Sequence, residues 1–228
     1  MSKGSLGPNR SALIVWGGWD GHSPQPFAER VSRSLASSGF TVRQADSLAV
    51  LGDEALLQSV ALIVPIWTMG ELAKEEWNAL ERAVRGGVGF AGFHGGMCDA
   101  FRTNTDYQFL TGGQFVRHPG GIIDYEVCIV EPEHPIMQGL ANFRLKSEQY
   151  YMHVDPSNHV LATTTFSGEH EGMDWIRGTQ MPVVWTRSYG KGRVFYASYG
   201  HAPEEFDGPE AMEIIARGLV WAAARSAT

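Results

Sequence analysis

Residues 87–96 read GVGFAGFHGG, an apolar run that leads into His94 with glycines close on both sides. An unbroken run of small and apolar residues is typical of a strand buried on both faces of a parallel sheet. The glycines let the chain turn sharply where bulkier residues would clash. The stretch therefore predicts a strand ending in a tight turn that presents His94, as the nucleophile elbow of α/β hydrolases presents serine. The alternative is a strand ending in a glycine-rich loop with an incidental histidine.

Strand and helix signals alternate on the N-terminal side of this turn. Apolar runs at residues 11–16 and 60–66 predict buried strands, and residues 40–45 predict a shorter one. Apolar residues at helical spacing lie between these strands, at positions 27–35 and 72–84, and a brief helix is expected at 53–57. Four alternations of strand and helix predict an α/β fold with a three-layer, doubly wound and mostly parallel sheet.

The pattern changes after Thr111, where antiparallel signals replace the alternation. Residues 122–130 and 159–165 predict strands, and the Tyr189–Gly192 turn predicts a hairpin between strands at 183–186 and 193–197. Two prolines and a glycine predict a loop at 131–143, and the polar, glycine-containing residues 169–180 predict a surface excursion. Residues 145–151 are ambiguous, and residues 209–224 predict a closing helix. We expect a polar tail over residues 1–10 and a single domain over 11–226 that adds antiparallel strands in its C-terminal half.

Composition and charge exclude several classes of protein. The net charge of -7 argues against nucleic acid as a partner, because a nucleic-acid site needs a concentrated basic face. No apolar run reaches the length of a membrane span, and residues 1–10 lack the apolar core of a signal peptide. Cys98 and Cys128 are expected to be free thiols. These features predict a cytoplasmic protein without a membrane partner, and an exposed apolar patch would permit a homo-oligomer.

Polar and aromatic residues follow several of the predicted strands. In a doubly wound sheet, ligands bind beyond the carboxyl ends of the strands, so these residues are expected to meet at one crevice. The alternatives are packing roles for Trp19 and Trp67 and exposed loop positions for His22 and His118. The candidate substrate-binding residues are Trp19, Asp20, His22, Trp67, Thr68 and His118, and Trp175 would add a third loop tryptophan suited to stacking on a sugar ring.

Three side chains are candidate metal ligands. Imidazole nitrogen and carboxylate oxygen both bind zinc, and His94, Glu148 and His201 would supply a catalytic set of three ligands. The sequence contains neither the His-Glu-x-x-His nor the Cys-x-x-Cys spacing that would support a zinc site independently. A divalent metal such as zinc therefore stays an open hypothesis at this stage.

The chain resembles the trehalose-utilisation (ThuA-like) family. The resemblance covers nearly the whole chain. Members of the family share the class I glutamine amidotransferase-like fold, which is flavodoxin-like. The family pattern commonly has Asp before the Glu148 position, where this chain has Ser147. The matching stretches are Gly92–Gly96, Gly112–Phe115, His118-Pro119, His134–Ile136, Gly139-Leu140, Glu148-x-Tyr150, Pro182-x-x-Trp185, Gly190–Tyr196 and Gly200-His201.

The resemblance implies sugar catabolism without glutamine hydrolysis. An amidotransferase of this fold has a cysteine nucleophile where this chain has His94, so the acyl-enzyme cannot form by that route. Members are associated with disaccharides such as trehalose and with their 3-keto derivatives. We expect elimination, hydrolysis or isomerisation by acid–base or metal-assisted chemistry, with His94, Glu148, Tyr150 and His201 as catalytic residues. The alternative is a non-catalytic sugar-binding or regulatory protein.

Overall fold

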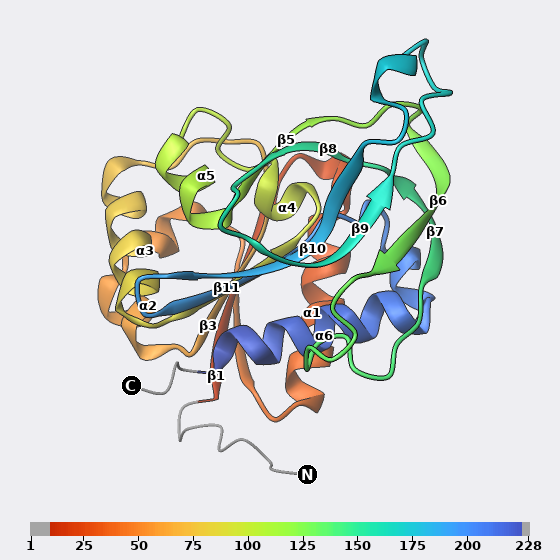
Figure 1. The fold of residues 1–228 in the computed structure, drawn as a ribbon. Helices are drawn as coiled ribbons and strands as arrows, with labels where there is room; N and C mark the ends of the chain where they lie inside the picture. The colour runs from red at the N-terminus through yellow and green to blue at the C-terminus, as the bar shows by residue number, and fades with distance from the viewer. Residues whose placement is uncertain (1–9, 225–228) are drawn as a thin grey trace.

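The computed structural model describes residues 10–224 and contains one large mixed sheet with helices on both faces (Figure 1). Within these residues the sheet has nine strands in the order β2-β1-β3-β4-β11-β10-β9-β6-β7. Strands β2, β1, β3, β4 and β11 are parallel to one another, and the remaining neighbours pair antiparallel. The fold is therefore the mostly parallel α/β architecture with added antiparallel strands that the sequence predicted.

The parallel half follows the predicted alternation closely. Its strands, in chain order, are β1 (Ser11–Gly18), β2 (Thr41–Ala45), β3 (Leu62–Thr68), β4 (Gly89–Phe93) and β11 (Gly192–Ala197). The helices that follow the first four strands are α1 (Pro24–Ser37), α2 (Glu54–Ser59), α3 (Lys74–Gly86) and α4 (Gly95–Cys98), and α6 (Pro209–Ala223) closes the fold. Short 3₁₀ helices are η1 (Asp20–His22), η2 (Leu48–Gly52), η3 (Asp174–Ile176) and η4 (Pro203–Asp207).

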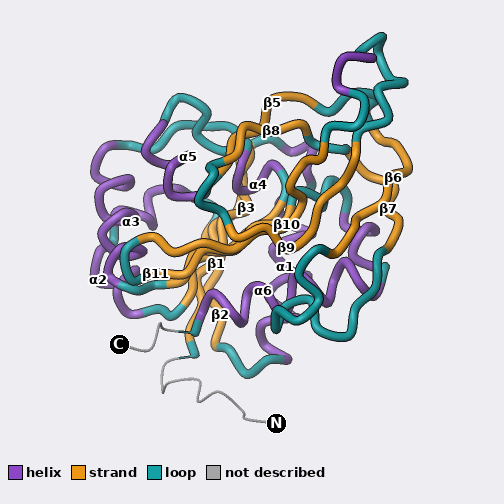
Figure 2. The backbone as a smooth tube through the Cα atoms, viewed as in Figure 1, coloured by secondary structure: helices purple, strands orange, loops and turns teal. Residues whose placement is uncertain are grey.

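Alternate residues of each central strand pack on opposite faces of the sheet. Ala12 and Ile14 of β1 pack in one apolar cluster with α1 and α6, whereas Leu13 and Val15 pack in a second cluster with α3. Successive side chains of a strand point to opposite faces, so a strand covered on both faces must be apolar throughout. The sheet and the helices packed on its two faces therefore form three layers, with one apolar cluster on each side of the sheet. Figure 2 shows the strands between the helices.

The antiparallel half widens the sheet beyond β11. It contains β6 (Ile122–Ile129), β7 (Phe143–Glu148), β9 (His159–Thr165) and β10 (Gln180–Tyr189). Tyr189 pairs with Gly192, so Gly190 and Lys191 form the two-residue hairpin loop that the sequence predicted. Strands β5 (Gly113–Arg117) and β8 (Tyr151–Val154) form a separate pair above the carboxyl ends of the parallel strands (Figure 1).

Several elements were not predicted from the sequence. These are the helices α4 and α5 (Thr105–Thr111), strands β5 and β8, and the 3₁₀ helices. The ambiguous residues 145–151 contain the end of β7 and the start of β8, separated by Gln149 and Tyr150. The predicted polar tail lies outside the described residues except for Arg10. None of the helices between residues 10 and 224 combines the length and apolarity that a membrane span requires.

Candidate active site

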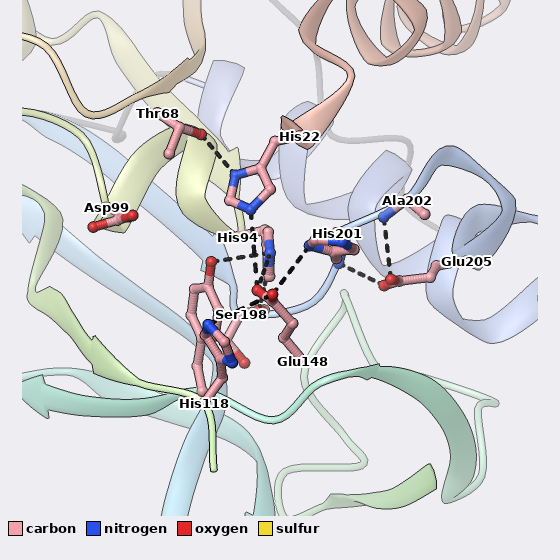
Figure 3. Close-up of polar contacts among 12 residues, drawn as sticks. His22, Thr68, His94, Asp99, His118, Glu148, Ser198, His201, Ala202 and Glu205 are labelled. Atoms are coloured by element: carbon pink, nitrogen blue, oxygen red, sulfur yellow. Dashed lines mark hydrogen bonds and ion pairs between the residues drawn. The ribbon is translucent and has the colours of Figure 1, made fainter. Parts of the chain in front are cut away.

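Histidines from three separate loops converge on Glu148. His22 ends η1 after β1, His94 follows β4, and His201 lies between β11 and η4. Glu148 ends β7, which lies far from these strands in sheet order but packs against η4. The imidazoles of His22, His94 and His201 surround the carboxylate (Figure 3). A compact group of ionisable side chains therefore lies at the carboxyl ends of the parallel strands.

His94 occupies the tight turn that its flanking glycines predicted. Its φ is 49° and its ψ is -145°, a conformation that favours glycine. His94 lies between the end of β4 and the start of α4. Its backbone N–H donates a hydrogen bond to the Ala197 carbonyl oxygen at 2.7 Å. The side chain is 1% exposed, and its Nδ1 lies 2.9 Å from the Ser198 carbonyl oxygen. The elbow prediction is confirmed in the backbone, with a histidine in the nucleophile position.

His22 is fixed beside His94 by a hydrogen bond and by the glycine that follows His94. Its Nδ1 lies 2.8 Å from Thr68 Oγ1, at the end of β3. A Cβ at Gly95 would come within 2.6 Å of the His22 ring, so this close approach requires glycine. His22 is only 7% exposed, which makes the alternative of an exposed loop residue wrong.

The two oxygens of Glu148 contact different histidines. Oε2 lies 3.2 Å from His94 Nε2 and 4.0 Å from His22 Nε2. Oε1 lies 3.4 Å from His201 Nδ1 and 3.6 Å from His118 Nε2. The His118 side chain is 40% exposed, so it forms the solvent-facing rim of the group.

Tyr150 closes the group on the side of β5 and β8. Its hydroxyl lies 2.9 Å from His94 Nε2, and its ring stacks on that of His94 with centroids 4.2 Å apart. Because the Ser198 carbonyl can only accept, His94 Nδ1 donates to it, and Nε2 lies between the Tyr150 hydroxyl and Glu148 Oε2. Phe115 of β5 lies against the Tyr150 ring at 4.5 Å between centroids and gives this wall an apolar backing.

Mutual contacts set the protonation states of the group. Burial alone would raise the pKa of Glu148, but the contacts with His201 and His94 outweigh it and hold the pKa well below its ordinary value. The Glu148 carboxylate raises the pKa of His201 even though burial acts the other way. Burial, followed by the charges of His94 and His201, lowers the pKa of His22 to about 3. At neutral pH the site therefore contains an ionised carboxylate beside a neutral His22.

The remaining predicted residues differ in how near they lie to Glu148. Trp19 packs edge-on against His22 with 4.7 Å between ring centroids and is 48% exposed, so it lies at the rim. Asp20 is exposed in η1. Trp67 packs on the apolar cluster beneath the sheet, and its ring would collide with a Cβ at Gly17, which fits the packing alternative. Trp175 lies in the excursion between β9 and β10 and is 75% exposed.

Two residues that shape the site were not predicted from the sequence. Phe115 belongs to a stretch that carried the family resemblance, but nothing in its spacing indicated contact with Tyr150. Glu205 in η4 accepts hydrogen bonds from the backbone N–H groups of Gly200 and Ala202, at 2.8 and 3.2 Å, and so fixes both neighbours of His201. A capping position at the start of η4 was its only signal in the sequence.

Family comparisons agree with this architecture. A family model described as ThuA, trehalose utilisation, matches residues 11–222. The chain belongs to the ThuA family. No curated protein matches the chain.

Solved structures of ThuA-like proteins share the fold over almost their full length. A protein described as ThuA-like from Bacteroides uniformis superposes with a TM-score of 0.78 at 21% identity, covering 97% of this chain and 94% of its own. A second, from Parabacteroides merdae, gives 0.75 at 19% identity with 96% and 92% covered. A cytoplasmic protein from Salmonella typhimurium gives 0.64 at 12% identity, with 95% and 100% covered. At these identities the likeness establishes the fold alone.

Proposed function

We propose that this ThuA-family chain is an enzyme of carbohydrate catabolism that acts on a disaccharide or on its 3-keto derivative. The observation that carries the proposal is the convergence of His94 and His201 on Glu148, with Tyr150 held against His94, at the carboxyl ends of the parallel strands. A site that only binds sugar needs hydrogen-bond donors and aromatic faces, whereas this one gathers groups that exchange protons. The membership of the family described as trehalose utilisation supports the substrate class.

Proton removal next to a ketone is the chemistry that this set of side chains suits best. When a base takes the proton on the carbon beside the carbonyl, the C–H bond breaks and its electron pair passes to the carbonyl oxygen as an enolate. A hydroxyl group that stays protonated can donate to that oxygen. Burial raises the pKa of Tyr150 well above its ordinary value, so this hydroxyl remains a donor throughout the neutral range.

The pair formed by Glu148 and His201 can hold or move the proton. Their contact at 3.4 Å raises the pKa of His201, which places its proton exchange nearer neutral pH than that of the low-pKa carboxylate. A divalent ion held by the same side chains would instead polarise the carbonyl as a Lewis acid. Both routes use Glu148, and His94 either holds the Tyr150 hydroxyl or would bind the ion, so loss of either side chain would strongly reduce turnover.

Space for a substrate adjoins His201. A cavity of about 420 Å³ opens there between β7 and η4, and Lys146, Glu204 and Phe143 contribute to its walls. This volume falls within the range of roughly 300–1,000 Å³ that small-molecule sites occupy. Its mixture of charged and apolar side chains suits a sugar, which presents hydroxyl groups at its edge and C–H groups on its face. The cavity also supports the alternative of a sugar-binding protein.

A turnover assay with matched variants tests the proposal. Purified protein would be incubated with 3-keto-trehalose and with trehalose, and products followed by mass spectrometry. We expect consumption of the keto sugar by wild type, with losses of at least roughly 100-fold in Glu148→Gln and His94→Ala. His153→Ala, which alters an exposed histidine of β8, is the control and should retain full activity.

Binding without turnover would decide for the alternative function. If calorimetry shows that wild type and Glu148→Gln bind the sugars equally and neither consumes them, the site is a binding site. Full turnover by the Glu148→Gln variant would reject the assigned residues.

A further inference from the structure

We propose that His22, His94, Glu148 and His201 form a binding site for one divalent first-row transition-metal ion. Each residue offers one ligand atom, and the four atoms lie within 4.8 Å of one another. Atoms that share a tetrahedral ion at bonds of about 2.0–2.2 Å lie roughly 3.5 Å apart, so small side-chain adjustments complete the site. The proposal does not depend on the sugar reaction.

The histidine orientations leave the right nitrogens free to bind an ion. His94 Nδ1 donates to the Ser198 carbonyl at 2.9 Å, which leaves Nε2, facing Glu148, as the ring nitrogen that can bind an ion. His22 also has an outer partner, with Nδ1 hydrogen-bonded to Thr68 Oγ1 at 2.8 Å and Nε2 facing the carboxylate. Metal-binding histidines usually have the second ring nitrogen held in this way, because the outer hydrogen bond fixes the tautomer and the ring orientation.

His201 supplies the most direct sign of a missing ligand. Its Nδ1 is buried and lies 3.4 Å from Glu148 Oε1, but among residues 10–224 it makes no hydrogen bond of good geometry. A buried polar atom without a well-aligned hydrogen bond costs free energy that a bond to a metal ion would recover. Glu205 fixes the loop on both sides of His201 through Gly200 and Ala202, so the ring is presented from a braced segment.

The donor set selects the class of ion. Three imidazole nitrogens and one carboxylate oxygen suit zinc, cobalt, nickel, manganese or iron(II), whereas magnesium and calcium prefer oxygen ligands throughout. The carboxylate also supplies the negative charge that partly balances the ion in a buried site. Binding would exchange the hydrogen bond from Tyr150 to His94 Nε2 for a bond to the metal and release that hydroxyl group.

The ion would remain accessible from the side of His118. The His118 side chain is 40% exposed and lies 3.6 Å from Glu148 Oε1, but it does not belong to the four-residue group. A fifth ligand, such as a substrate oxygen, would enter from this rim, as occurs at zinc sites that expand to five ligands.

The test measures metal binding directly, without an activity assay. Full-length protein is stripped with a chelator and dialysed, then loaded with Zn²⁺ for elemental analysis and with Co²⁺ for absorption spectroscopy. We expect one ion per chain and visible Co²⁺ bands of a four- or five-coordinate site. His22→Ala, His94→Ala, Glu148→Gln and His201→Ala should each weaken Zn²⁺ by more than roughly 100-fold, because even outer contacts cost 10–100-fold.

Two further variants distinguish a specific metal site from adventitious binding. Thr68→Val removes the outer hydrogen bond to His22 and should weaken Zn²⁺ by roughly 10–100-fold. His159→Ala is the matched control, since His159 belongs to a second histidine–glutamate contact with Glu131 on the exposed surface and should bind as wild type.

Specific outcomes would overturn the metal site. Wild-type protein that binds no more Zn²⁺ or Co²⁺ than the Glu148→Gln variant, with circular dichroism showing both folded, would do so. Equal loss in His159→Ala would likewise assign the ion to the surface. Full metal binding by a protein that consumes no keto sugar would reject the proposed reaction and leave the metal site standing.

Discussion

His94 combines an unfavourable backbone conformation with a buried ring that makes two hydrogen bonds. A φ of 49° with a ψ of -145° costs a residue bearing a Cβ about 1–3 kcal/mol relative to its preferred regions. The ring offsets this cost through its contacts with Ser198 and Tyr150. Once the ring is removed, glycine should therefore fit this position better than alanine.

We predict that His94→Gly is more stable than His94→Ala by about 1 kcal/mol. Glycine ordinarily destabilises a chain relative to alanine because its unfolded state has more freedom, so the expected order is reversed here. Urea denaturation of both variants measures the difference. At the exposed helical position Gln58, the same pair of substitutions should show the ordinary order. An alanine variant at position 94 as stable as the glycine variant would show that the turn holds no strain.

The sequence indicated single site residues better than it indicated their contacts. The glycines around His94 predicted its turn, because flanking glycines are a local signal of backbone geometry. Glu148 and His201 were selected through the family resemblance, and the contacts between them depend on β7 approaching η4 across the sheet. His22 looked like a surface loop residue, since its burial depends on Gly95 and Thr68, which lie far away in the sequence.

The loop between β11 and η4 is an element whose shape depends on one carboxylate. Glu205 accepts from the backbone of both neighbours of His201. We predict that Glu205→Gln weakens Zn²⁺ binding about tenfold, because an amide has one accepting oxygen where the carboxylate has two. Competition with a chromophoric chelator measures the affinity. Glu204→Gln, an exposed neighbour in the same 3₁₀ helix, should leave it unchanged. Equal affinities in both variants would mean that Glu205 does not position His201.

An ion pair between the half-buried Asp155 and the buried Arg187 attaches the turn between β8 and β9 to β10. Asp155 Oδ2 lies 3.3 Å from Arg187 Nη1, and the Arg187 side chain is 5% exposed. The hydrogen bond from Ser157 and, less strongly, Arg187 lower the pKa of Asp155 from its ordinary 3.8. A carboxyl group with a lowered folded-state pKa stabilises the fold above its unfolded pKa, and this contribution disappears as the pH falls through the folded-state value.

We predict that Asp155→Asn lowers the free energy of unfolding by about 2–3 kcal/mol at pH 7, because it leaves the Arg187 charge buried without its partner. The difference from wild type should shrink at pH 3, and denaturant titrations at both pH values test this. Asp207→Asn is the control, since Asp207 pairs with Arg30 at the surface and should cost less than about 1 kcal/mol. A penalty that does not change with pH would exclude the titration of Asp155 as its source.

Elements with a strong periodic pattern were predicted, and short ones were not. The buried strands and the amphipathic helix α3 carry long apolar signals that local sequence specifies. Among the residues that the structure describes, β5 and β8 pair only with each other, and their pairing has one register irregularity. A strand of four or five residues has too few alternations to be distinguished from loop, so its pairing is decided by the tertiary fold.

Across the whole molecule, the site joins the parallel and antiparallel halves of the sheet. His22 and His94 come from the parallel half, Glu148 from β7 at the far edge, and His201 from the loop that leads into α6. An ion bound by all four would connect segments that are 179 positions apart along the chain, from His22 to His201. Because the unfolded chain cannot bring these ligands together, the ion would bind the folded state almost exclusively.

We therefore predict that a chelator lowers the melting temperature of metal-loaded wild type by about 5–10 °C. Free ion at about 100 times its Kd contributes about 2.7 kcal/mol, and each kcal/mol shifts Tm by roughly 2–4 °C in a chain of this size. Differential scanning calorimetry with and without chelator measures the shift. His22→Ala should melt at one temperature in both conditions, because it has lost the ion already. A chelator effect of equal size in this variant would place the stabilising ion outside the cluster, since only a site that includes His22 loses its ion when that ring is removed.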